Sequence, residues 1–329
     1  QWPLYNDGTI NANAQAGADI NVLPAWEKTA GRSDVIVAVV DEGVEYTHPD
    51  LAGNMWSGIG KNFCDRDNDD ITWGEGHGTH VAGTIAAVSN NGIGISGIAG
   101  GTGGGNGAKI MSCEIFHPTD GHYDANSNAT ADAIKYAADN GAVICQNSWG
   151  YAATRAGRNA SSYINPVHKE AIDYFIKYAG CDNKGEQLDG SPMKGGIVLF
   201  ASGNANTSDP RIAAPADYEK VVAVAAIEAD YRKASYSNYG TYTDISAPGG
   251  SLDGDGRIWS TTTERSNNYE YLAGTSMACP LVSGVAALVI EKYGVGKKGF
   301  TPEALKEILY QSAYDLDEYN PRYAGQLGH

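Results

Sequence analysis

The chain has 329 residues, and its 39 Asp and Glu outnumber its 23 Lys and Arg, which gives a formal net charge of −16 at pH 7. This negative balance argues against nucleic acid and anionic membrane surfaces as partners, because both bind clustered positive charge. The longest apolar runs are much shorter than the roughly 20 residues that span a bilayer, so we expect no membrane span. No proline- or serine-rich linker divides the sequence, and we expect a single domain over residues 1–329, with trimming at both ends.

Short, continuously apolar runs alternate with helical patterns along the chain. The first run, at residues 34–40, is rich in β-branched residues and stops at Asp41, as expected of a parallel strand covered on both faces. The alternation predicts an α/β fold, a three-layer sandwich with a mainly parallel, doubly wound sheet. Such sheets bind ligands at the carboxyl ends of their strands. Further strands are predicted at 109–116, 142–146, 196–201, 221–226 and 243–246, and helices at 77–88, 130–140, 166–179 and from Ser276 onward.

Three side chains with complementary chemistry stand at a strand end and at two helix starts. Asp41 follows the first strand, His77 lies between glycines before a helix, and Ser276 precedes a long apolar helical run. Taken singly, each has an ordinary structural interpretation: a turn residue, a buried histidine and a helix N-cap. Together they supply the carboxylate, base and nucleophile of acyl transfer. Pro280 has no N–H to pair with the carbonyl of Ser276, so we expect a loosened first turn in this helix.

The context of these residues resembles that of the subtilisin-like serine proteases, or subtilases. The motifs are Val-Val-Asp-Glu-Gly-Val around Asp41, His-Gly-Thr-His-Val-Ala-Gly-Thr from His77, and Gly-Thr-Ser-Met-Ala-Cys-Pro around Ser276. Their order differs from the Ser, Asp, His order of α/β-hydrolases, whose Gly-x-Ser-x-Gly motif is also missing. Intermediate landmarks match from Ala25 to Tyr310. The resemblance implies a subtilisin-like fold and a secreted serine endopeptidase that forms an acyl-enzyme on Ser276.

The same resemblance implies an oxyanion hole and a substrate pocket. Asn204 would donate its side-chain amide to the oxyanion, and the backbone N–H of Ser276 would be the second donor. Without the family match, Asn204 would be a plausible turn residue. The walls are small and apolar, although Asp209 lies close to them in the sequence, and we expect a broad or apolar/aromatic preference before the scissile bond. The implied substrate-binding residues are Ser148, Trp149, Gly150, Ala201, Ser202, Gly203, Ala213 and Ala214.

Two stretches resemble the calcium loops of thermitase-like subtilases, and imply structural Ca²⁺. The first has oxygen ligands only, which suits this hard cation. Its glycines also match a dinucleotide-binding fingerprint, but they follow a helix instead of a strand, which excludes that interpretation. The second is an acidic run that would otherwise be a solvated loop. The implied ligands are Asp50, Val88, Asn91, Ile93 and Ile95 in the first loop, and Asp65, Asp67 and Asp69 in the second.

The five cysteines show no zinc-ligand spacing and allow at most two disulfides, with the pairing open. Cys113, Cys145 and Cys279 lie in apolar runs and are expected to be buried free thiols, and we expect Cys279 to have no role in the chemistry. The N-terminus has no initiator Met and no signal-like apolar region, so we expect a processed, secreted or cell-surface chain. The resemblance also implies an N-terminal propeptide outside this sequence, polypeptide substrates and a monomer.

Two other functions share these residues. A peptide ligase or macrocyclase would use the same acyl-enzyme with an amine in place of water, although no insertion in the sequence is suited to excluding water. A catalytically inactive binding domain on the same scaffold would have no physical reason to keep Asp41, His77, Ser276 and Asn204.

Overall fold

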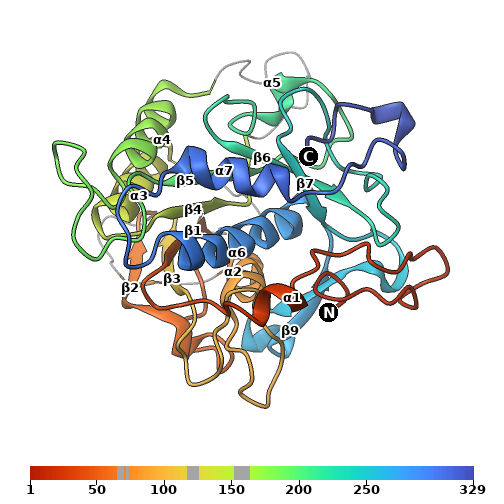
Figure 1. The fold of residues 1–329 in the computed structure, drawn as a ribbon, viewed down its shortest axis with the longest axis horizontal. Coiled ribbons are helices and arrows are strands. Elements are labelled where there is room, and N and C mark those ends of the chain that lie inside the picture. The colour runs from red at the N-terminus through yellow and green to blue at the C-terminus, as the bar shows by residue number, and fades with distance from the viewer. Residues whose placement is uncertain (65–69, 72–73, 117–125, 152–163) are drawn as a thin grey trace.

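The computed structural model in Figure 1 describes residues 1–64, 70–71, 74–116, 126–151 and 164–329. Its centre is a sheet of seven parallel strands, ordered β2-β3-β1-β4-β5-β6-β7. Six of the strands were predicted, and β2 was not. The strands are β1 (Ile36–Asp41), β2 (Met55–Asn62), β3 (Lys109–Glu114), β4 (Ile144–Asn147), β5 (Ile197–Ala201), β6 (Val222–Ile227) and β7 (Ile245–Pro248).

Helices cover both faces of this sheet, which confirms the predicted three-layer α/β sandwich. Successive residues of a strand point to opposite faces. Val37 and Val39 of β1 therefore belong to one apolar cluster, and Ala38 and Val40 to the other. The first cluster packs under α2 (His77–Ala86), α6 (Thr275–Tyr293) and α7 (Pro302–Gln311), and the second under α3 (Ser127–Asp139) and α4 (Pro166–Tyr178).

The chain order reverses around β1. From β1 the chain runs to β2 and β3 on one side, and it then crosses to β4 on the other side and continues outward to β7. In open parallel sheets, ligands bind in the crevice at such a reversal, outside the carboxyl ends of the strands. The carboxyl ends of β1 and β4 border this crevice. They carry Asp41 and, directly after β4, Ser148.

The helix α6 is the most deeply buried long helix of the structure. By length and composition alone it could cross a membrane, although the sequence led us to expect no membrane span. In the fold, however, 72% of its most apolar window is buried, and it packs against α2 and the sheet. The core helix of a globular fold can have the same length and composition, and α6 packs as such a helix.

A two-stranded antiparallel hairpin, β8 (Ile258–Thr261) and β9 (Tyr269–Leu272), leads directly into α6 and was not predicted. His80 of α2 is fully buried, and its Nε2 lies 3.1 Å from the carbonyl of Ile258 and 3.2 Å from that of Glu270. Burial lowers the pKa of His80 to about 3, so the neutral ring donates this bond. The hairpin therefore joins the helix that carries His77 to the helix that carries Ser276. Short helices lie at α1 (Leu23–Trp26) and α5 (Pro210–Ala213).

Cys113, Cys145, Cys181 and Cys279 are free thiols. Cys113, Cys145 and Cys279 are fully buried, as predicted. Burial raises the pKa of the Cys279 thiol far above its usual range, which keeps this sulfur protonated and unreactive at neutral pH.

Candidate active site

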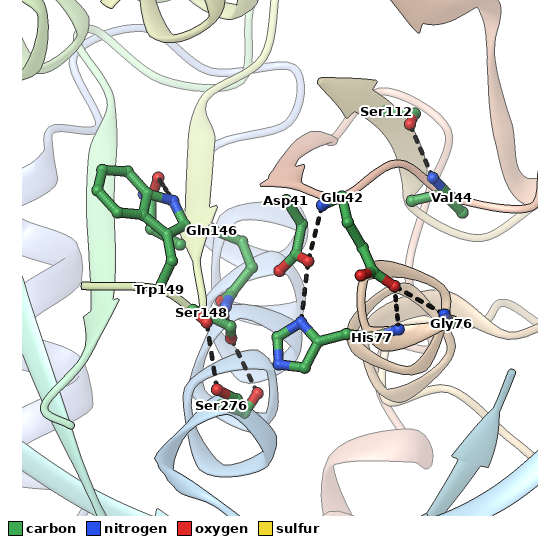
Figure 2. Close-up of polar contacts among 11 residues, drawn as sticks. Asp41, Glu42, Val44, Gly76, His77, Ser112, Gln146, Ser148, Trp149 and Ser276 are labelled. Atoms are coloured by element: carbon green, nitrogen blue, oxygen red, sulfur yellow. Dashed lines mark hydrogen bonds and ion pairs between the residues drawn. The ribbon is translucent and has the colours of Figure 1, made fainter. Parts of the chain in front are cut away.

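Asp41 and His77 meet across the crevice between β1 and α2. His77 Nδ1 donates to Asp41 Oδ1 over 2.9 Å, and the same oxygen accepts the backbone N–H of Glu42, also at 2.9 Å. The Asp41 side chain is 3% exposed, whereas that of His77 is 34% exposed. The approach of the two elements depends on Gly78, where a Cβ would lie 2.3 Å from the carbonyl oxygen of Gly43. In Figure 2 the His77 ring lies between the Asp41 carboxylate and Ser276.

Burial and the neighbouring carboxylates act in opposite directions on the pKa of His77. Burial alone would lower the pKa of His77, but the Asp41 carboxylate, through its charge and its hydrogen bond, and the charge of Glu42 outweigh burial and raise it to about 8. The imidazolium form of His77 is therefore favoured by two adjacent carboxylates. A ring with this property is suited to accepting a proton from a neighbouring hydroxyl.

Ser276 and Ser148 form a reciprocal pair at the start of α6. Ser276 Oγ donates to the carbonyl of Ser148 over 3.2 Å, and Ser148 Oγ donates to the carbonyl of Ser276 over 2.9 Å. This second carbonyl is the one that Pro280 leaves without its helical N–H partner. The first turn is therefore secured by a side chain from the end of β4, where the sequence led us to expect loosening.

Gln146, the residue two positions before Ser148, supports this pair and was not foreseen. Its Nε2 donates to Ser148 Oγ over 2.8 Å, and its Oε1 accepts from Ser283 Oγ at 2.5 Å and from Cys279 Sγ at 3.3 Å. Gln146 is fully buried in β4. The sequence signal is a polar side chain at the end of an otherwise apolar strand, which marks the position of Gln146 but not its partners.

Asn204 lies beside the start of α6. Its Oδ1 accepts two bonds from Thr275, one from the backbone N–H at 2.9 Å and one from Oγ1 at 2.8 Å. Because Oδ1 is engaged in this way, Nδ2 is turned away from Thr275 and lies near Gly274, where a Cβ would be 3.5 Å from it. Asn204 is exposed, so its Nδ2 is accessible to a bound group.

A cavity of about 270 Å³ opens next to Ser276 and Asn204. Ser202 and Ala214 lie outside its lining: Ser202 is fully buried, and the carbonyl of Ala214 accepts the backbone N–H of Tyr151 at 3.0 Å. Of the substrate residues implied by the sequence, Ser148, Trp149, Gly150, Ala201, Gly203 and Ala213 line this cavity. Residues that the sequence did not indicate also line it, namely Tyr151, Ala205, Ile212, Asn238 and Thr275.

The wall of this cavity combines apolar and aromatic groups with the polar side chains of Ser148, Asn204 and Asn238. The Trp149 ring packs edge-on against Phe200, with 5.0 Å between the ring centroids. Asp209 is not among the lining residues and forms an ion pair with Arg211, whose Nε lies 2.8 Å from Asp209 Oδ1. The acid that could have attracted a basic substrate side chain is thus paired elsewhere.

The structure describes the first of the two predicted calcium loops. Asp65, Asp67 and Asp69, which belong to the second, lie outside the described residues. Asp50 is fully buried. It accepts Asn91 Nδ2 at 2.6 Å, the backbone N–H of Ile95 at 2.8 Å and the Tyr269 hydroxyl at 3.2 Å. Asn91 Oδ1 accepts the N–H of Ile93 at 3.1 Å.

The donor types of this loop fit a hard cation. One buried carboxylate lies against the Asn91 side-chain amide, and rotation of this amide by half a turn would direct its oxygen to the side of Asp50. Among the residues that the structure describes, no cluster of three or more His, Cys, Asp or Glu side chains offers a different type of metal site.

Comparison with known proteins gives a consistent result. A model of the subtilase family matches residues 32–327. A thermophilic serine proteinase of Bacillus sp. strain AK1 is 38% identical over 80% of this chain and 54% of its own length. Thermitase of Thermoactinomyces vulgaris is 33% identical over 86% and 84%. The crystal structure of fervidolysin from Fervidobacterium pennivorans, a keratinolytic enzyme related to subtilisin, matches with a TM-score of 0.64 at 31% identity, over 89% of this chain and 41% of that one.

The chain spans about half the length of the first curated relatives that it matches. Other relatives are named as an extracellular protease, from Xanthomonas campestris, and a cell wall-associated protease, from Bacillus subtilis.

Proposed function

Because this chain belongs to the subtilase family, we propose that it is a serine endopeptidase that hydrolyses peptide bonds through Asp41, His77 and Ser276. The observation that carries the proposal is the 2.9 Å bond from His77 Nδ1 to buried Asp41, with the His77 ring between Asp41 and Ser276 (Figure 2). This bond places the proton on Nδ1, so that Nε2 is free to act as a base.

In the proposed reaction the Ser276 hydroxyl turns from the carbonyl of Ser148 to His77 Nε2. His77 takes the proton while Ser276 Oγ attacks the scissile carbonyl carbon, and the pair of carboxylates stabilises the imidazolium. The oxyanion is held by Asn204 Nδ2 and by the backbone N–H of Ser276, one of the first N–H groups of α6 that lack a partner within the helix. His77 then protonates the leaving amine, and water releases the acyl group by the same route.

We further infer a broad or apolar/aromatic preference before the scissile bond. The residues Ser148-Trp149-Gly150 follow β4 and offer backbone groups to which an extended peptide can pair as an added strand. Alanine, glycine, isoleucine and aromatic side chains line part of the cavity beside them, and serine, threonine and asparagine side chains line the rest. Pairing through the backbone explains how one site accepts many sequences.

We propose that Ca²⁺ stabilises the first loop. Asp50 would supply its carboxylate, Asn91 its side-chain oxygen, and Val88, Ile93 and Ile95 their carbonyls. The bound cation would hold the loop that follows α2, and it takes no part in the proposed reaction. Secretion is supported by the names of the extracellular and cell wall-associated relatives. The propeptide, the monomeric state and the second calcium loop stay predictions.

A fluorophosphonate probe and casein test the central proposal. The wild-type protein should be labelled and should degrade casein, and Ser276→Ala should lose both. Ser266→Ala, which changes a serine of a surface turn, is the matched control and should keep both. Absence of labelling in folded wild-type protein would contradict the proposal. Labelling with transfer to an added amine, and without hydrolysis, would instead favour a ligase.

A further inference from the structure

Glu42, the residue after Asp41, is a buried carboxylate to which the proposed reaction gives no step. It is 2% exposed, and its Oε1 accepts the backbone N–H groups of Gly76 at 2.7 Å and of His77 at 2.6 Å. These are N–H groups at the start of α2, where a helix has no internal partners for them. Gly76, the N-cap residue, makes no side-chain cap itself. Glu42 therefore caps α2 from the end of β1.

The two consecutive acids reach His77 by different routes. Asp41 binds the imidazole ring, whereas Glu42 binds the main chain of the same residue (Figure 2). The capped segment requires glycine at position 76, because Gly76 has φ = +108° and a Cβ there would lie 2.2 Å from Thr262 Oγ1. Burial, and then the charge of Asp41, raise the pKa of Glu42, whereas the charge of His77 and the N–H groups of His77 and Gly76 act in the opposite direction and favour the carboxylate.

We propose that Glu42 is a positioning residue of the active site: its buried carboxylate anchors the main chain of His77 and stabilises the imidazolium that His77 forms during acyl transfer. The inference rests on the proposed function, since it presumes that His77 is the base.

The other groups that act on the His77 ring are few. Among the described residues they are Asp41, which directly binds the ring, and His80 of α2, which is neutral over the working range because burial lowers its pKa to about 3. Glu42 is the second negative charge, and its effect on the pKa of His77 has the same sign as that of Asp41. Removing that charge should therefore make His77 less basic.

Substitution of Glu42 separates the charge from the anchor. Glu42→Gln keeps the length and an acceptor oxygen but removes the charge. It should lower the pKa of His77 by roughly 0.5 to 1 unit, and it should shift the acid limb of the pH profile of kcat/KM to lower pH by the same amount. Glu42→Asp keeps the charge but is too short to reach both N–H groups. It should leave the acid limb near its wild-type position and lower the plateau of kcat several-fold.

Glu75→Gln is the matched control, because Glu75 is an exposed acid directly before Gly76. It should leave the acid limb in place. The pKa of the His77 ring is measured in parallel by NMR on histidine-labelled protein, which requires no activity. Absence of peptidase activity in the wild-type protein would contradict the proposed function, while the NMR titration would still show whether Glu42 changes the pKa of the His77 ring.

An unchanged His77 pKa in Glu42→Gln, or an equal change in Glu75→Gln, would overturn the inference. If Glu42→Gln does not fold, the test rests on Glu42→Asp. A plateau of kcat equal to that of the wild type would then show that the hydrogen bonds between Glu42 and the main chain are not needed.

Discussion

The pairing of Ser148 with the start of α6 leads to a quantitative prediction. Ser148→Ala removes the hydroxyl that donates to the carbonyl of Ser276 over 2.9 Å and that accepts from Gln146 over 2.8 Å. The carbonyl has no replacement within the helix, because residue 280 is proline. Leaving this partly buried carbonyl without a partner should cost about 1–3 kcal/mol of unfolding free energy.

The expected change in melting temperature follows from the size of the chain. An unfolding entropy of about 2.1 cal/mol/K per residue gives about 0.7 kcal/mol/K for this chain, so Ser148→Ala should lower Tm by about 1.5–4 °C. The measurement is best made by calorimetry in a Ser276→Ala background, in which self-digestion is excluded and the backbone carbonyl is unchanged.

A double-mutant cycle identifies the cause. Pro280→Ala restores an N–H four residues after Ser276, which can satisfy the carbonyl from within α6. In that background Ser148→Ala should cost less than about 0.5 kcal/mol. Ser246→Ala is the matched control: it removes a 2.7 Å bond from this β7 side chain to the carbonyl of Leu327, and it should cost the same in both backgrounds. Equal costs for Ser148→Ala with and without Pro280 would refute the reasoning.

Three further predictions concern the base, the oxyanion hole and the calcium loop. Because His77 must be neutral to act as a base and its pKa is raised to about 8, kcat/KM should rise with pH through an apparent pKa near 8; a profile that is flat from pH 6 to 9 would contradict this. The same shift stabilises the fold below the unfolded pKa near 6.5, and this contribution should fade as pH rises through 8. Asn204→Ala should lower kcat by roughly 10²–10³-fold with little change in KM, as measured in steady-state assays; a loss confined to KM would assign Asn204 to ground-state binding instead. EDTA should lower the melting temperature of wild type. In Gly94→Ala, where a Cβ would lie 2.2 Å from Asp50 Oδ2, EDTA should have no further effect, whereas a wild-type melting curve unchanged by EDTA would exclude a structural cation.

The sequence predicted the buried strands well, because each is a continuous apolar run. It missed β2, whose residues are mostly half-exposed and whose pairing with β3 is irregular between Met55 and Gly60. Within it, Ile59 has φ = +62°, which no propensity for extended structure would suggest. It also missed β8 and β9, which are only four residues long and owe their pairing to the fold around them.

The residues of the proposed site also divide into those that the sequence predicts and those that it does not. Asp41, His77 and Ser276 could be selected because motifs surround them. The roles of Glu42 and Gln146 could not, because each depends on contacts that only packing creates. Gln146 binds Ser283, 137 positions later in the chain, and Glu42 reaches the main chain of a helix that begins 35 positions away. Local patterns carry no information about such pairs.

The hairpin that joins α2 to α6 has a consequence for how the protein matures. Ser276 follows Asp41 by 235 positions, and the helix that presents it is held by β4, by α2 and by strands formed just before it. Contacts over such separations form late, since closing long loops is slow. A growing chain would therefore carry its base and its carboxylate long before its nucleophile. The proposed site would therefore be completed in one of the last steps of folding, when α6 packs against the sheet and α2.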